Sequence, residues 1–173
     1  MYRWYFTSYL PSYDYGDGAE PISVARANLW HRLDEPALTE RDWIVKAFAS
    51  SNTGDAESPL TNSGTWFSEF DTLQLNYEDD LAQVDALELA RVIQAEHYLG
   101  VMFDRQVIVN HYDLAPEPFS GEPTSWVFQG SNDGIGWSGL HIVTDYDWQP
   151  FFDGGTEHDD VVRFEIAHVQ RMV

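Results

Sequence analysis

Short runs of aromatic and β-branched residues, each ended by Gly, Pro, Asn, Asp or Ser, recur along most of the chain. Such runs are typical of strands, and the residues that end them are typical of turns. The pattern predicts strands at residues 2–10, 22–30, 43–48, 65–67, 98–103, 106–114, 126–129, 140–143 and 161–166. This many short strands in 173 residues predicts an all-β fold, a β-sandwich.

Local signals add detail to this pattern. Residues 132–134 read Asn-Asp-Gly, a strong tight-turn signal, between the strands predicted at 126–129 and 140–143. Within 22–30, the apolar positions Val24 and Ala27 lie on opposite faces of a regular strand. This change of parity predicts a bulge between them.

The segment 78–95 fits two patterns. An acidic start is followed by Leu81 and Val84 at helical spacing, which predicts one short inserted helix. Leu87 and Leu89 alternate as in a strand, so the segment fits an irregular or extended structure as well.

Composition excludes several classes of partner and site. The chain has 29 acidic and 9 basic side chains and a formal charge of −20, with the basic residues scattered singly. Nucleic acid and anionic membranes, which attract clustered Lys and Arg, are therefore not expected as partners. The chain has no cysteine, which excludes disulfides and thiolate metal sites. A hydrophobic fraction of 43% is enough to form a core and predicts a folded protein. The sequence shows no signal peptide and no apolar run of membrane-span length, so we expect the protein to be made in the cytoplasm.

One segment resembles a known family. Residues 123–140 read PTSWVFQGSNDGIGWSGL, which is similar to the central hairpin of the discoidin family, also called coagulation factor 5/8 type C or galactose-binding-like. YLGVMFD at 98–104 and VIVNHY at 107–112 resemble the two strands that precede that hairpin, and AFASS at 47–51 and GTW at 64–66 resemble its early elements. The resemblance implies a jelly-roll β-sandwich, with residues 67–97 as an insertion.

The order of the elements differs from the family. The family's last two strands have no counterpart after residue 166, but YRWYFT at 2–7 and ISVARANL at 22–29 resemble them. We therefore expect one circularly permuted domain over 1–173, in which residues 1–32 form an N-terminal hairpin that completes the sandwich. The termini of a β-sandwich often lie close together, so such a permutation is sterically reasonable.

The permuted form resembles small proteins encoded by tailed bacteriophages. The resemblance implies a non-enzymatic structural or adhesion protein of the virion, either a capsid decoration or a tail or fibre component, that assembles with other virion proteins and binds cell-surface glycans. A free-standing carbohydrate-binding module is the alternative. The sequence carries no nucleophile elbow, phosphate loop or paired-carboxylate signature, so we do not expect an enzyme.

Discoidin-like domains often hold a structural calcium ion. One of its ligands in the family is a Glu in the last strand, the strand that residues 22–29 resemble. Arg26 occupies the matching position here, and the calcium loop is shortened to residues 60–64. Because a guanidinium opposes a cation, calcium binding is disfavoured at this place and we expect no metal. We expect no other cofactor either. The six histidines lack metal-ligand spacing and are expected at the surface or in packing.

Aromatic residues in loops are the candidates for sugar contacts, since an aromatic face stacks on a sugar ring. The carbohydrate-binding candidates are Tyr13, Tyr15, Phe151 and Phe152, with Tyr9 and Trp148 as further loop aromatics. Protein interfaces use the same residue types, so these loops fit a protein partner as well. The sequence places Trp4, Trp66, Trp126 and Trp137 in the core.

Overall fold

The computed structural model describes residues 1–9, 22–51, 54–61, 63–68, 97–117, 121–153 and 161–167. These parts of the chain are mostly strand: β1 (Tyr2–Tyr9), β2 (Ser23–Val24), β3 (Arg26–Trp30), β4 (Ile44–Ala49), β5 (Trp66–Phe67), β6 (His97–Phe103), β7 (His111–Ala115), β8 (Pro123–Gly130), β9 (Ser138–Val143) and β10 (Val162–Glu165). Helix within them is limited to short turns: η1 (Leu38–Glu40), η2 (Ser58–Leu60) and α2 (Gln149–Asp153). The prediction of an all-β chain is confirmed.

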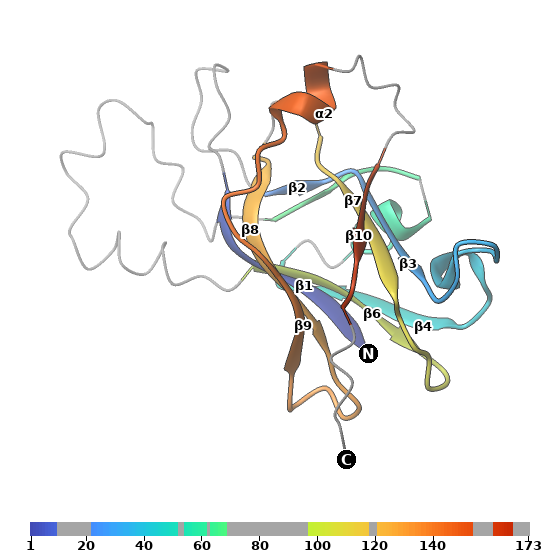
Figure 1. Cartoon of the computed structure of the whole chain (residues 1–173). Coiled ribbons are helices and arrows are strands. Elements are labelled where there is room, and N and C mark those ends of the chain that lie inside the picture. The colour runs from blue at the N-terminus through green and yellow to red at the C-terminus, as the bar shows by residue number, and fades with distance from the viewer. Residues whose placement is uncertain are drawn as a thin grey trace, which may run out of the picture.

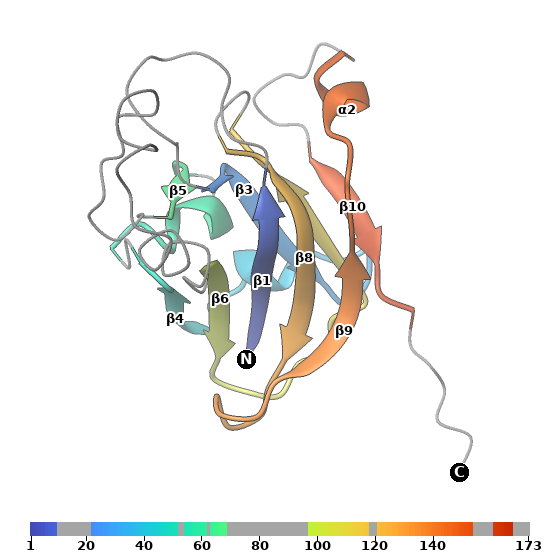
Figure 2. The same ribbon diagram turned by 90° about the vertical axis from the view of Figure 1, so that its left-hand side faces the viewer.

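The strands form antiparallel sheets. Five strands lie in the order β4-β6-β1-β8-β9, three in the order β10-β7-β3, and β2 pairs with β5. The five-stranded sheet lies in front of β3 and β7 in Figure 2, and the view turned by 90° in Figure 1 separates the same two layers. The inner faces of these layers enclose the core.

Large aromatic side chains fill the space between the layers. Trp4, Trp126 and Phe128 of the five-stranded sheet and Tyr112 of β7 are all fully buried. The Tyr112 ring lies 4.6 Å from that of Phe128 and 6.1 Å from that of Trp4, measured between centroids. Burial of each such side chain contributes about 1.5–3 kcal/mol, so these contacts dominate the cohesion of the two layers.

A polar chain runs through this aromatic core. Trp126 Nε1 donates a hydrogen bond to Tyr112 Oη at 2.9 Å, and Tyr112 Oη lies 2.8 Å from His141 Nδ1 on β9. The indole nitrogen is donor-only, so the Tyr112 proton remains for His141. The three side chains thus satisfy one another where an unpaired polar group would be costly.

The N-terminal strands do not form the predicted hairpin. β1 lies between β6 and β8 in the five-stranded sheet, whereas β3 pairs with β7 in the other layer. Hairpin loops usually have two to five residues, and the connection from Tyr9 to Ile22 is much longer. The two strands therefore complete different sheets, and the chain alternates between layers.

Other strand predictions are confirmed with shifted bounds. The predicted strand at 106–114 begins only at His111, and Ile108 before it is 61% exposed. The parity change within 22–30 corresponds to a break at Ala25, where β2 ends and β3 begins. The predicted helix at 78–95, and nearly all of the predicted insertion 67–97, lie outside the described residues.

Candidate functional site

The outer face of the five-stranded sheet carries the candidate site. Trp4 and Phe6 of β1 are buried in the core, so the alternating residues Arg3 and Tyr5 point to the opposite face. Figure 2 has this face toward the viewer, with β1 between β6 and β8. The central strand thus presents one cation and one aromatic ring on the outer face.

The register across β6 and β8 builds a cluster around β1. Arg3 lies opposite Gly100 on β6 and Gln129 on β8, and Tyr5 lies opposite Tyr98 on β6. Side chains directly opposite one another on a face are in contact range. Arg3 Nε donates a 2.7 Å hydrogen bond to Gln129 Oε1, which fixes the guanidinium on the sheet.

Aromatic rings surround the Arg3 guanidinium. Its central carbon lies 4.2 Å from the ring centroid of Trp137, 5.1 Å from that of Tyr98 and 5.2 Å from that of Tyr5. A cation over an aromatic face is attracted by the ring quadrupole, by about 0.5–1 kcal/mol at exposed sites. Several rings around one guanidinium therefore hold it in a defined place.

The predicted turn between β8 and β9 positions Trp137. Asp133 Oδ1 accepts hydrogen bonds from the backbone N–H groups of Ile135 and Gly136, both at 2.9 Å, and these bonds lower the pKa of the Asp133 carboxyl. Gly134 has a φ of 75°, a conformation that glycine adopts without strain. The turn is thereby fixed by its own hydrogen bonds, and Trp137 follows directly.

Phe48 of β4 completes the aromatic wall. Its ring centroid lies 6.2 Å from that of Tyr98 and 6.1 Å from that of Trp137. The ring lies across Gly100, where an added Cβ would come within 2.5 Å of Phe48 Cε2 and 2.8 Å of the Tyr2 carbonyl oxygen. The Phe48 ring can pack over β6 because Gly100 has no side chain.

These residues border an open cavity of about 360 Å³, which we call the outer-face cavity; it is lined by Met1, Arg3, Lys46, Phe48, Tyr98, Met102, Gly134 and Trp137. Small-ligand sites usually have about 300–1,000 Å³ and combine aromatic walls with a few polar groups. A second hollow of about 1040 Å³ adjoins it through Met1 and Met102, but its lining includes the carboxylates of Asp104 and Asp133. Of the two, the outer-face cavity is the one whose described lining residues combine aromatic rings and cationic groups without a carboxylate.

The carbohydrate-binding candidates from the sequence lie elsewhere. Tyr13 and Tyr15 are outside the described residues. Phe151 and Phe152 belong to α2, are half-buried and pack on each other with centroids 5.4 Å apart. They do not line the outer-face cavity, and their role in sugar binding stays a prediction.

Two expectations for tryptophans are wrong. Trp148 is 1% exposed and donates from Nε1 to the Pro123 carbonyl at 2.7 Å, so it is a core residue. Trp137, expected in the core, is half-buried on the outer face. Trp4, Trp66 and Trp126 are fully buried as expected.

Arg3, Lys46, Phe48 and Tyr98 were not among the site residues predicted from the sequence. One signal was present: Trp4 and Phe6 alternate with Arg3 and Tyr5, so one face of that strand had to carry a cation beside an aromatic ring. The partners on β4 and β6 had no local signal, because they depend on which strands pair. Cross-strand register, not sequence proximity, assembles this site.

Among the described residues, His, Cys, Asp and Glu side chains form no group of three or more that could hold a metal ion. No helix in the described ranges is long and apolar enough to cross a membrane.

Comparison with protein-family models, with curated proteins and with solved structures finds no match to this chain.

Proposed function

We propose that this chain is a non-enzymatic adhesion protein that binds a glycan in the outer-face cavity. The observation that carries the proposal is the combination, in one cavity, of Trp137, Tyr98 and Phe48 with the donors of Arg3 and Lys46. A sugar has an apolar C–H face and a polar rim. Aromatic rings contact the first, and N–H donors bind the hydroxyl oxygens of the second.

The pre-formed arrangement of Arg3 favours this function. Its guanidinium is already fixed by Gln129 and by the rings of Trp137 and Tyr98. Ligand binding then costs little ordering of protein side chains, which matters because immobilising a flexible side chain costs about 0.5–1.5 kcal/mol.

A glycan array tests the proposal, with the Trp137→Ala variant as the binding-deficient form. We expect the parent to bind a subset of glycans and the variant to lose that binding. Trp43→Ala is the matched control, because Trp43 also packs against arginines: its ring centroid lies 4.7 Å from Arg41 Cζ and 4.5 Å from Arg105 Cζ. Trp43 does not line the outer-face cavity. Equal glycan binding by the parent and by Trp137→Ala would contradict the proposal.

The finer fold that we propose is a jelly-roll β-sandwich of the permuted discoidin type. It is supported by the two antiparallel layers and by the places of β1 and β3 in different layers. The resemblance of residues 123–140 to the family's central hairpin supports it further, since β8 and β9 are paired across that turn. Fold alone does not fix function.

The setting that we propose is the virion of a tailed phage, where the chain serves as a capsid decoration or as a tail or fibre component in contact with other virion proteins. The support is the discoidin resemblance in its permuted order. Mass spectrometry of purified particles should find the chain at a fixed high copy number. If the particles lack the chain, the alternative of a free-standing carbohydrate-binding module takes its place.

We propose that folding needs no calcium. Arg26 lies on β3 opposite Ala115 of β7, at the position where the resemblance implies a calcium-binding Glu. The melting midpoint should be nearly the same in millimolar calcium and in excess chelator at matched ionic strength. A bound ion at about 100 times its Kd contributes about 2.7 kcal/mol, so a drop of many degrees on chelation would contradict this proposal.

A further inference from the structure

We infer that the outer-face cavity selects a saccharide that carries a carboxylate, and that Arg3 and Lys46 bind this group. The inference rests on the proposed function, because it names the class of glycan for the same cavity. The observation that supports it is separate from glycan binding in general. It is the distribution of ion pairs between the basic side chains and the carboxylates of this acidic protein.

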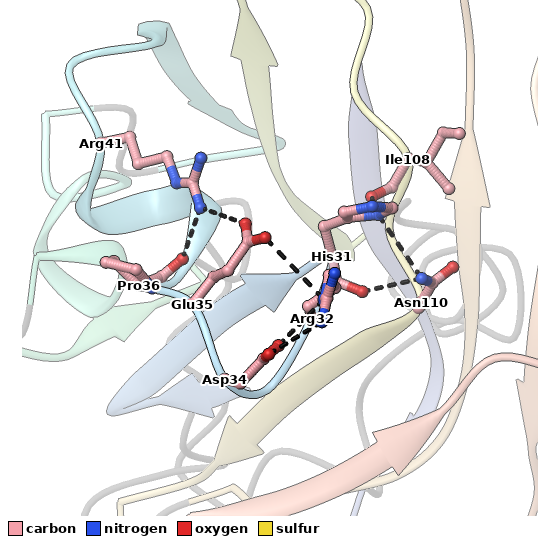
Figure 3. Close-up of polar contacts among 8 residues, drawn as sticks. All are labelled: His31, Arg32, Asp34, Glu35, Pro36, Arg41, Ile108 and Asn110. Carbon is pink, nitrogen blue, oxygen red and sulfur yellow. Dashed lines mark hydrogen bonds and ion pairs between the residues drawn. The ribbon is translucent and has the colours of Figure 1, made fainter.

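Four described arginines are bound to carboxylates of the chain. Figure 3 shows two of them on either side of η1, where Arg32 pairs with Asp34 and Arg41 pairs with Glu35, each at 2.8 Å. The other two ion pairs join Arg105 to Asp104 and Arg163 to Asp113, both at 2.6 Å. With 29 acidic side chains for 9 basic ones, a carboxylate partner is the expected state of a cation in this chain.

Arg3 and Lys46 depart from this pattern. Within the described ranges neither has a carboxylate within ion-pair distance, and the acceptor bound by Arg3 is the neutral Gln129. The outer-face cavity, which both residues line, has no Asp or Glu among the described residues of its lining. Two cations with no counter-ion in the described part of the chain therefore lie in one cavity of a protein with a formal charge of −20.

The two cations offer complementary donors. Arg3 uses Nε for Gln129, which leaves both Nη groups without a hydrogen-bond partner in the described chain and available as a fork for a planar carboxylate. Lys46, the sole lysine of the sequence, is exposed on β4 and brings a mobile point charge to the same cavity. An acidic sugar can place its ring on Trp137 and its carboxylate between these two groups.

The net negative charge does not prevent this binding. At physiological ionic strength the Debye length is about 8 Å, so carboxylates elsewhere on the surface are largely screened from a ligand in the cavity. Contacts with Arg3 and Lys46 are direct and much shorter than the Debye length, so they are screened much less. The local pair therefore determines the preference between an acidic sugar and its neutral analogue.

Matched glycan pairs test the inference. We would titrate the parent protein with sialyllactose against lactose, and with a glucuronide against the methyl ester of the same glucuronide. We expect the acidic member of at least one pair to bind about tenfold or more tightly than its neutral partner, the effect of one charge-assisted hydrogen bond. Equal binding within both pairs overturns the inference and leaves the proposed function intact. Failure of every array glycan and of all four probes overturns both.

Charge variants locate the effect. Lys46→Gln, at an exposed position that should not affect folding, and Arg3→Gln should each weaken acidic-sugar binding about tenfold. Each should weaken neutral-sugar binding less, because a neutral sugar loses a hydrogen bond there but no charge interaction. Arg3→Lys, which keeps the charge without the fork, should retain part of the affinity. Arg32→Gln is the control, with the same charge change outside the cavity. Affinity that falls as much in Arg32→Gln as in Lys46→Gln would overturn the assignment to this cavity.

Discussion

The Asp113 carboxylate accepts two hydrogen bonds from the Arg163 guanidinium, from Nε at 2.6 Å and from Nη2 at 2.9 Å. The two residues lie opposite each other on β7 and β10. Trp30 Nε1 donates a third bond to Asp113 at 2.8 Å, and the Asp113 side chain is 2% exposed. A carboxylate in this position depends on its donors, because water reaches little of it.

Removal of Arg163 should therefore be costly. In Arg163→Ala, Asp113 keeps one donor and loses the charge that compensates it, so we expect a loss of about 1–3 kcal/mol in the free energy of unfolding. Urea denaturation measures it. Arg32→Ala, which breaks the exposed pair with Asp34, should leave the unfolding midpoint almost unchanged. Similar midpoints for the two variants would contradict this view of Asp113.

Trp126 and Trp137 should respond differently to the same substitution. Trp126 is fully buried and donates to Tyr112, so Trp126→Ala should cost about 3–5 kcal/mol. Trp137 lies half-buried over Arg3, so Trp137→Ala should cost about 1 kcal/mol. Guanidinium unfolding of both variants gives the comparison. A larger loss for Trp137→Ala would place that ring among the residues that hold the layers together.

Gly100→Ala should distort the outer face. The new Cβ would meet both the Phe48 ring and the Tyr2 carbonyl, and the backbone oxygen cannot move without shifting β1. We expect a loss of about 1–3 kcal/mol, as for overpacking in a core, together with weaker glycan binding because Phe48 is displaced. Gly54→Ala is the control, since no described residue comes within 4 Å of its added Cβ. Equal melting midpoints for the parent and Gly100→Ala would contradict this account of Phe48.

The parts of the fold that the sequence predicted are those with local causes. The Asn-Asp-Gly turn fixes the β8–β9 connection through hydrogen bonds within a few residues, as Asp133 with Ile135 illustrates. The expected burial of Trp4, within the run of aromatic residues that predicts the strand at 2–10, is confirmed as well. Both signals are contained in a short window, so composition and spacing suffice to identify them.

The partners of each strand have no such local signal. β1 pairs with β6 and β8, both more than ninety residues away in the sequence, because this arrangement buries Trp4 against Tyr112 of the other layer. The misplacement of Trp137 has a related cause, since the register of β8 and β9 shifts between Phe128 and Gln129. Counting alternate positions across that irregularity predicts the wrong face.

The stability of the chain should depend on pH through His141 and His97. Burial lowers the pKa of both imidazoles below the ordinary value of 6.5, so the folded chain holds them neutral at pH values where the unfolded chain binds a proton. For His141 the structure adds a second reason: a neutral Nδ1 can accept a hydrogen bond from Tyr112 Oη, 2.8 Å away, and burial raises the pKa of Tyr112, which keeps this hydroxyl protonated. A protonated Nδ1 cannot accept that bond.

The sign of the effect follows from this difference. Well above pH 6.5 the two imidazoles are neutral in the folded and in the unfolded chain, so they contribute no pH dependence. As the pH falls through 6.5 toward the lowered pKa values of the folded chain, the unfolded chain binds more protons than the folded chain, and stability is lost. The exposed carboxyls of Asp34, Asp104 and Asp133 have pKa values below 3.8 and stay ionised in this window. We would compare urea midpoints at pH 7.5 and 5.5 for the parent and for the double variant His97→Gln/His141→Gln. The change in general charge repulsion is common to both proteins, so the parent should lose stability relative to the variant. Equal changes in the two midpoints would show that neither imidazole is held neutral by the fold.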